Sequence, residues 1–182
     1  MLVPIGRKIL AEHFRADYGW ASNEPRNYRA SLGAGVTKDL EVEFYLSRLE
    51  PDGVFGTFDV SYNALSPLMD YAPGISLGML DVMDRTTLGR TGYLAVTWAL
   101  GLDGSYNRQT PLDITIGVRV GRDSKGFVAA SVPFTWAFRL MAEHDGFNPR
   151  VGLEFQPRRG LPLRWMTDPS GPSWGVRWSG RF

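Results

Sequence analysis

Apolar and polar residues alternate with a period of two along most of the chain, most clearly in residues 111–121. The alternate positions of one parity, here the even-numbered residues, are apolar: Leu112, Ile114, Ile116, Val118 and Val120. The positions of the other parity, the odd-numbered residues, are polar or small: Asp113, Thr115, Gly117 and Arg119. Because successive side chains of a β-strand point to opposite faces, this pattern predicts a strand with one apolar face and one polar face.

The same alternation recurs throughout and predicts an all-β protein. Strands are expected near 27–37, 39–49, 55–63, 74–83, 92–101, 111–121, 126–134, 137–144, 149–156, 161–167 and 173–182. Residues 1–26 could hold one further element. The sequence fits an extra strand near 7–18 and a short N-terminal helix at "RKILAEHF" equally well. In 74–83 the apolar parity changes after Met79, which indicates a β-bulge near Gly78 or a different strand boundary.

Short segments rich in turn residues separate the expected strands, among them "EPDG", "GRDSKG" and "DGFNP". Strands joined by short turns pair antiparallel in chain order, so the sequence predicts a meander in a single domain, residues 1–182. A flat sheet of this width would expose two edges. Closure into a barrel of about 10–12 strands removes both edges.

The composition narrows the range of functions. The formal net charge is +1, which gives no support to nucleic-acid binding. The chain has no cysteine and only two histidines, so disulfides and thiolate metal sites are excluded and a histidine metal cluster is not expected. We therefore expect no metal, no cofactor and no nucleic-acid partner.

The consecutive residues Glu143, His144 and Asp145 are the most suggestive of catalysis. On a strand, however, Glu143 and Asp145 share one face and His144 points away from both. We expect the two carboxylates to pair with arginines such as Arg139 and Arg164, and His144 to lie near the strand end. No other nucleophile and base stand in a recognisable pattern, so we expect neither a catalytic residue nor an enzyme.

The alternation does not say which face points inward. Soluble barrels and sandwiches turn the apolar face inward, whereas membrane barrels turn it towards lipid. The strand lengths suit a tilted membrane crossing of about 9–11 residues, and the polar faces carry arginine and carboxylates but few lysines. Aromatic residues near strand ends fit interfacial girdles: Tyr28, Tyr71, Tyr93, Trp136, Trp165, Trp174 and Trp178. The alternative is a soluble β-barrel or sandwich that binds an apolar ligand or a protein partner.

In a transmembrane β-barrel, the polar faces would line the lumen. The charged candidates for this lining are Arg29, Glu41, Glu43, Asp113, Arg119, Arg139, Glu143, Glu154, Arg164 and Arg177. Unpaired charges are costly away from water, so these groups are expected to form arginine–carboxylate pairs. Such pairs would leave the lumen narrow or plugged.

The last ten residues, "SWGVRWSGRF", place Trp174, Val176, Trp178 and Phe182 at alternate positions. This ending resembles the assembly signal of bacterial outer-membrane barrels. Together with "FRLMAEHDGFNPRVGLEFQPRRGLPLRW", it resembles the end of the YjbH-like family of outer-membrane barrels, which is associated with exopolysaccharide gene clusters. The resemblance covers about residues 56–182, and the chain is shorter than the long members of that family.

The resemblance implies a monomeric protein of the bacterial outer membrane with a structural or accessory role in envelope or exopolysaccharide export. Its partners would be the lipid bilayer, the barrel-assembly machinery that reads Phe182, and a polysaccharide or export component. The first twenty residues lack the apolar core of a secretory signal peptide. We therefore expect such a signal to be absent from this chain or to have been removed.

Overall fold

A computed structural model describes residue 9 and residues 12–21, 27–49, 53–86, 89–101, 111–158 and 160–181. These residues form twelve β-strands and no helix. The strands are β1 (His13–Ala21), β2 (Tyr28–Gly35), β3 (Leu40–Leu49), β4 (Gly53–Leu65), β5 (Gly74–Leu80), β6 (Thr91–Leu100), β7 (Leu112–Val120), β8 (Lys125–Pro133), β9 (Phe138–His144), β10 (Pro149–Arg158), β11 (Leu161–Asp168) and β12 (Gly171–Arg181).

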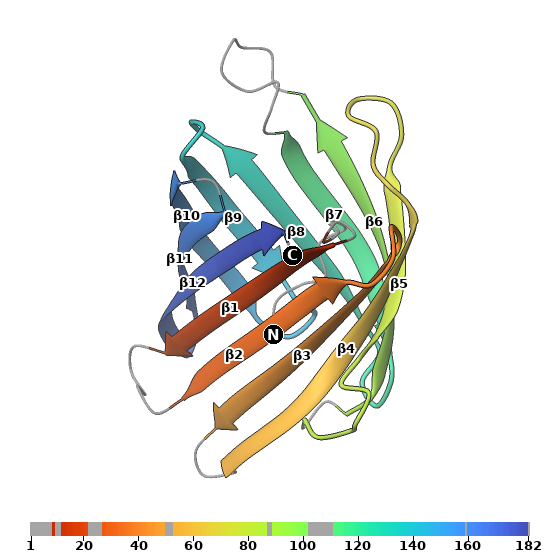
Figure 1. Ribbon diagram of the computed structural model, residues 1–182, viewed down its shortest axis with the longest axis vertical. Helices are drawn as coiled ribbons and strands as arrows, with labels where there is room; N and C mark the ends of the chain where they lie inside the picture. Colours follow the sequence, from red (N-terminus) through yellow and green to blue (C-terminus); the bar gives the residue numbers. More distant parts are fainter. Residues whose placement is uncertain are drawn as a thin grey trace.

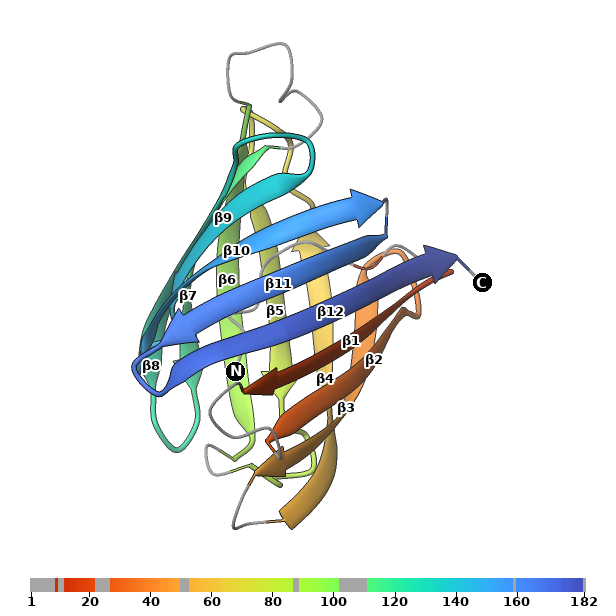
Figure 2. The same cartoon turned by 90° about the vertical axis from the view of Figure 1, so that its left-hand side faces the viewer.

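Each strand pairs antiparallel with its neighbours in chain order, and β1 pairs with β12 to close the barrel (Figure 1). Figure 2 shows β10, β11, β12 and β1 side by side and strongly tilted against the long axis of the molecule. The seam between β1 and β12 runs in regular register from His13 opposite Arg181 to Ala21 opposite Ser173. The predicted antiparallel meander, closed into a barrel of ten to twelve strands, is confirmed.

The apolar parity of the strands faces outward and the polar parity faces inward. On β7, Ile116 and Val118 are 46% and 48% exposed, whereas Asp113 and Arg119 are 4% and 2% exposed. β6 repeats the pattern, since its alternate residues from Thr91 to Ala99 are buried. On these two strands the large aliphatic side chains are therefore the outward ones, and on β7 the charged side chains are the inward ones.

The structure decides two alternatives that the sequence leaves open: β5 ends at Leu80 rather than at residue 83, and the described part of the N-terminal element is a strand. No bulge lies at Gly78, since β5 pairs regularly with β6 through that residue and the register shift falls on β4, between Asn63 and Leu65. The apolar parity changes because Leu80, the last residue of β5, is an apolar residue on the inward parity of Ser76 and Gly78, where it is buried. Near the N-terminus, the strand begins at His13, after a turn at Glu12 with a φ of 62°, so it starts and ends later than residues 7–18.

The wall formed by β5 to β8 carries a small apolar cluster inside the barrel. Its members are Leu80, Tyr93, Ala95, Phe127 and Ala129. Glycines make room for the rings: a Cβ at Gly78 would lie 2.7 Å from Tyr93, and one at Gly117 would lie 2.3 Å from Phe127. Tyr93 is thus an interior residue, and its expected place in an outer aromatic girdle was wrong.

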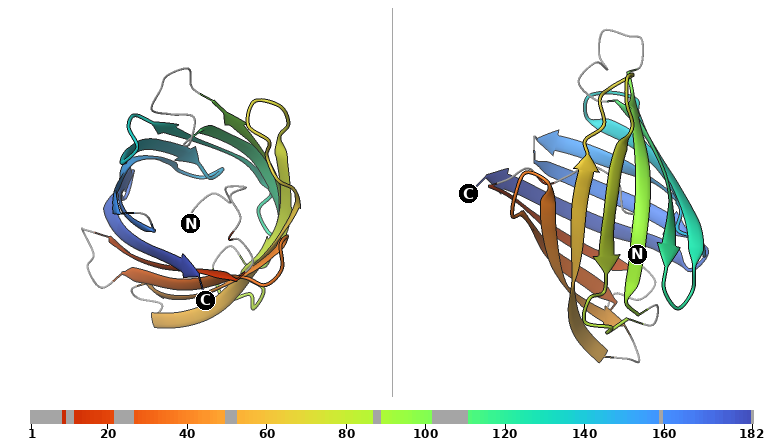
Figure 3. Two further views of the ribbon diagram at one scale, coloured as in Figure 1. Left: turned by 45° about the horizontal axis from the view of Figure 1, so that its top comes forward. Right: turned by 90° about the vertical axis from the view of Figure 1, so that its right-hand side faces the viewer.

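The turns gather at two rims, and Figure 3 shows the ring of strands between them. Rim A is the end where β1 begins and β12 ends, and it includes residues 36–39, 66–73 and 134–137. Rim B is the opposite end, and it includes residues 81–86, 121–124, 145–148 and 169–170. Both rims consist largely of short turns, which is why neighbouring strands remain paired over most of their length.

Candidate functional site

The charged interior is the strongest candidate for a functional site. All ten charged residues selected from the sequence lie on the inward parity of their strands, and none of them is more than about a third exposed. They come from seven strands. The closed barrel therefore brings together groups that are far apart in the sequence.

One interior cluster crosses the seam of the barrel. Arg177 on β12 donates from Nε to an Asp17 carboxylate oxygen on β1, at 2.7 Å. The other Asp17 oxygen lies 3.0 Å from Nε of Arg15, and the Arg15 guanidinium also pairs with Glu43 on β3. These four residues connect β12, β1 and β3 through charge. Each side chain is about a quarter exposed, which places the cluster in a partly hydrated interior.

A second cluster is centred on Arg139 of β9. Its guanidinium donates to Asp113 Oδ2 at 3.1 Å, to Ser131 Oγ at 2.9 Å and to the Pro111 carbonyl at 3.1 Å. Both members of the ion pair are at most about a tenth exposed. Buried charges of this kind are held in place when hydrogen bonds satisfy the guanidinium from several sides.

A third pair, Glu154 on β10 and Arg164 on β11, stands directly opposite in the register, with a donor–acceptor distance of 2.7 Å. Beside it lies a hollow of the inner wall. The hollow is lined by Asp113, Ser131, Arg139, Met141, Glu154, Arg164 and Arg177. Three guanidiniums and two carboxylates therefore face one space inside the barrel.

A fourth cluster lies towards rim B around Arg150. Its guanidinium pairs with Glu143 at 3.3 Å, with Asp145 at 3.5 Å and with Asp168 at 3.1 Å. Glu143 and Asp145 do share a face, and His144 is exposed on the other side. The expected arginine partners were wrong, however, because Arg139 pairs with Asp113 and Arg164 with Glu154.

Asp145 also organises the turn that follows β9. Its Oδ1 accepts hydrogen bonds from the backbone N–H of Phe147 and of Asn148, each at 2.9 Å. Burial alone would raise the pKa of Asp145, but these N–H groups and the nearby Arg150 hold the pKa below its ordinary value. The carboxylate is therefore a turn-forming anion at neutral pH, and nothing in its contacts suits a general acid or base.

Two predicted residues contact aromatic rings. The Arg29 guanidinium carbon lies 4.0 Å from the centre of the Tyr45 ring, and Arg29 also lies 4.0 Å from an Asp59 oxygen. The Arg119 guanidinium carbon lies 5.4 Å from the centre of the Phe127 ring. Cation–π contacts stabilise a guanidinium where water is scarce. Glu41 accepts a hydrogen bond from the Asn63 side chain at 2.8 Å.

Sequence reasoning missed four members of these clusters: Arg15, Asp17, Arg150 and Asp168. Arg15 and Asp17 alternate with Ala16 and Tyr18, but they fall in a segment whose sequence fits a strand and a short helix equally well. Arg150 shares the parity of Gly152 and Glu154 and could have been found from that signal alone. Asp168 is the last residue of β11, and the turn residues that follow it do not continue the alternation of apolar and polar positions.

The outer face is apolar over the whole circumference. Among the outward strand positions that the structure describes, the titratable groups other than tyrosines are Arg48 at the end of β3, His144 at the end of β9 and Arg158 at the end of β10. Arg48 and His144 lie close to rim B. Arg158, after the register shift in β10, lies at rim A. A band without charged side chains therefore separates the two rims.

Aromatic residues concentrate towards both ends of this outer face. Near rim B, register pairs place Trp165, Trp174, Trp20 and Tyr28 in one row across β11, β12, β1 and β2. Near rim A, Trp178 packs edge-on against Phe14 with ring centres 5.0 Å apart. Of the predicted C-terminal pattern, Trp174, Val176 and Trp178 share the outward parity, and Phe182 lies outside the described residues.

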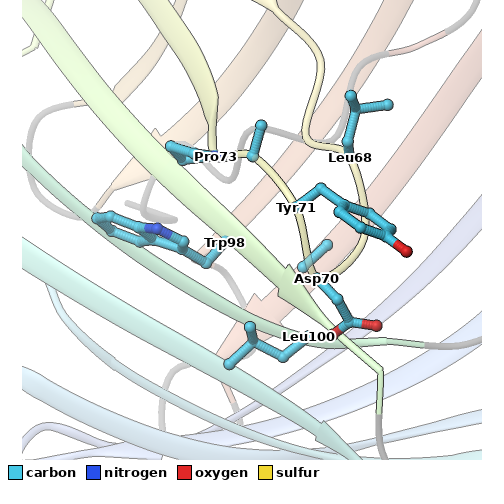
Figure 4. A pocket seen from close by; sticks show the side chains of 8 residues that line it. Leu68, Asp70, Tyr71, Pro73, Trp98 and Leu100 are labelled. Atoms are coloured by element: carbon cyan, nitrogen blue, oxygen red, sulfur yellow. The ribbon is translucent and has the colours of Figure 1, made fainter.

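Rim A has a shallow hollow where the turn between β4 and β5 folds against the end of β6 (Figure 4). The backbone N–H of Asp70 donates to the Ala99 carbonyl at 2.9 Å, and Asp70 Oδ1 accepts from the Gly101 N–H at 2.6 Å. The Asp70 carboxylate thus fastens the turn to the barrel wall. Tyr71 beside it is 91% exposed.

Over the described part of the chain, no group of three or more His, Asp or Glu side chains has an arrangement that could hold a metal ion. No helix among the described residues is long and apolar enough to cross a membrane. Neither a protein-family model nor a curated protein matches this sequence. Any assignment of function therefore depends on the two faces of the barrel.

Proposed function

We propose that this protein is a transmembrane β-barrel of the bacterial outer membrane. The observation that carries the proposal is the direction of the two faces, with the apolar parity exposed outside and the charged parity buried inside. Moving one large aliphatic side chain from water into an apolar medium stabilises it by about 1.5–3 kcal/mol. An outer band built mostly from aliphatic and aromatic side chains is therefore expected to lie in hydrocarbon.

The backbone meets the other requirement of a bilayer. Hydrocarbon offers no hydrogen bonds, so a spanning sheet must close on itself and leave no edge unpaired. The twelve strands close through the pairing of β1 with β12. Their lengths of seven to thirteen residues bracket the about 9–11 residues that a tilted crossing needs.

The aromatic rows and the rims support the same placement. Tryptophan and tyrosine side chains prefer the level of the lipid headgroups, and the row from Trp165 to Tyr28 ends beside Arg48 in the register of β2 and β3. An arginine next to this row would reach phosphate groups from the headgroup layer. Rim B would then mark one surface of the membrane.

The interior supports a structural or accessory role and gives no support to open conduction. Barrels of about eight strands are filled by side chains, and those of about sixteen strands leave a channel. With twelve strands, the paired side chains of Arg139, Arg150, Arg164 and Arg177 project into the remaining space. Through its resemblance to YjbH-like barrels, the protein would act in envelope or exopolysaccharide export.

Extraction and gel mobility test the membrane proposal. The protein should leave the membrane fraction only in detergent, and its gel mobility should differ between unheated and boiled samples. Release without detergent would contradict the proposal. In planar bilayers the purified barrel should show little conductance, and large steady currents would contradict the narrow lumen.

A further inference from the structure

The hollow beside Glu154 has hydrogen-bond donors to spare. Arg164 uses one terminal nitrogen on Glu154, and its buried Nε has no hydrogen-bond partner among the described residues. Arg177 uses Nε on Asp17. A guanidinium has five N–H donors, and a buried donor left unsatisfied costs about 1–3 kcal/mol. Both side chains line the same hollow.

Among the described residues, the two seam strands place glycines at inward positions next to these donors. Gly19 on β1 and Gly175 on β12 face each other in the register and share the inward parity of Asp17 and Arg177. A Cβ built on Gly175 would lie 3.6 Å from the Tyr18 carbonyl oxygen and 4.0 Å from Cβ of Arg164. These are ordinary contact distances, so a side chain would fit there and its absence leaves room beside both arginines.

The neighbouring charges define what could occupy this room. The positive charges of Arg164 and Arg177 lie close enough to repel each other. Each guanidinium already donates one N–H group to a carboxylate, Arg164 to Glu154 and Arg177 to Asp17. An added anion with two coplanar oxygens would bridge the unused edges and relieve that repulsion. The fixed carboxylates Glu154 and Asp17 would disfavour a more highly charged anion at the same place.

We propose that Arg164 and Arg177 form a binding site for the carboxylate of a small acidic ligand, such as a uronic acid. This inference rests on the proposed function, because a barrel accessory to polysaccharide export would meet acidic sugars in its lumen. The guanidiniums would bind the carboxylate, and the inward glycines Gly19 and Gly175 would admit the rest of the ligand. The remaining wall of the hollow would be formed by Ser131, Met141 and the Asp113–Arg139 ion pair.

Calorimetric titration of the folded, detergent-solubilised full chain tests the site. Sodium glucuronate should bind, and glucose, which has the same ring without the carboxylate, should not. Sulfate should bind at least tenfold more weakly than glucuronate. Equal binding of sulfate, or equal binding of glucose, would overturn the assignment.

Three variants locate the binding. Arg177→Gln removes one guanidinium, and Gly175→Val places a side chain beside Arg164 without changing charge. Each should weaken glucuronate binding about tenfold or more, the loss expected for one charge-assisted contact. Arg181→Gln is the matched control, because Arg181 lies on the same strand but pairs with Glu12 at the exposed rim. It should change binding less than twofold.

The gel mobility of the unheated protein reports whether each variant folds. If Arg177→Gln does not fold, Gly175→Val alone tests the site. An effect of Arg181→Gln as large as that of the interior variants would overturn the site. So would unchanged binding in Gly175→Val. A barrel that enters lipid vesicles but binds no glucuronate would refute this inference and leave the membrane proposal standing.

Discussion

Asp17 and Arg177 form an ion pair of 2.7 Å although they lie 160 residues apart in the sequence. The pair stands in register across the seam between β1 and β12, where the barrel closes. Because both side chains are only about a quarter exposed, neither charge is fully hydrated. The pair therefore links the two ends of the sheet from inside the barrel, in addition to the backbone hydrogen bonds.

Asp17→Asn should weaken the seam. It leaves Arg177 partly buried without its charged partner, and the free energy of unfolding should fall by about 1–3 kcal/mol. Urea unfolding of the folded barrel, followed by tryptophan fluorescence, measures the loss. Glu12→Gln is the control, because the Glu12–Arg181 pair at the rim is about two-thirds exposed and should contribute little. Equal losses in the two variants would contradict the role of the seam pair.

A charge placed on the outer face should impair insertion. Ile116→Arg puts a guanidinium in the middle of the outward face of β7, and membrane insertion should become less favourable by about 2–4 kcal/mol. Refolding yield into phosphatidylcholine vesicles measures the effect, with Ile116→Leu as the apolar control. Equal yields for the two variants would mean that this face does not contact hydrocarbon.

The C-terminal aromatic pattern predicts an assembly phenotype. Phe182→Ser should lower the amount of folded barrel in the outer membrane of cells and leave the stability of correctly folded, purified protein nearly unchanged. Quantitative immunoblotting of unheated membrane samples measures the assembled fraction. Thr167→Ser, an outward position of β11 away from the C-terminus, is the comparison. Normal assembly of the Phe182 variant would remove the support that this ending gives to the resemblance.

The turn after β9 should respond to acid through Asp145. The pKa of Asp145 is lowered in the folded protein, so the carboxylate stabilises the fold fully above its ordinary pKa of about 3.9. That contribution is lost as the pH falls through the lower folded value. The difference in unfolding free energy between the unmodified protein and Asp145→Asn should thus be constant from pH 5 to 7 and shrink below about pH 4. A difference between the two proteins that stays the same at pH 3 and pH 6 would contradict this role of Asp145.

The sequence predicts the strands well because alternation is a local property. Ile114, Thr115 and Ile116 alternate in the chain and therefore alternate in space, whatever surrounds the sheet. Leu80 shows the limit of this reasoning. It is an apolar residue on the inward parity, where it packs in the interior cluster with Tyr93 at the point where β5 ends. The end of a strand depends on its neighbours, which the local pattern does not contain.

The sequence predicts which charged residues share the polar face, but it does not predict how they pair. The parity of Arg139 and Arg164 assigns them to the polar face, and the closed barrel turns that face inward. Their partners depend on register, because Asp113 lies 26 residues from Arg139 and reaches it across β8. The direction of the polar face was also beyond the pattern, because period two is the same for a barrel in water and a barrel in lipid.

The absence of cysteine allows the central claim to be tested position by position. Single cysteines introduced along residues 112–120 and labelled with a nitroxide can be measured in lipid vesicles by electron paramagnetic resonance. Labels at 114, 116 and 118 should collide mainly with oxygen, which dissolves in the bilayer, and labels at 113, 115 and 117 should be shielded from it. Outward labels that collide mainly with a water-soluble nickel chelate would contradict a barrel that spans the membrane.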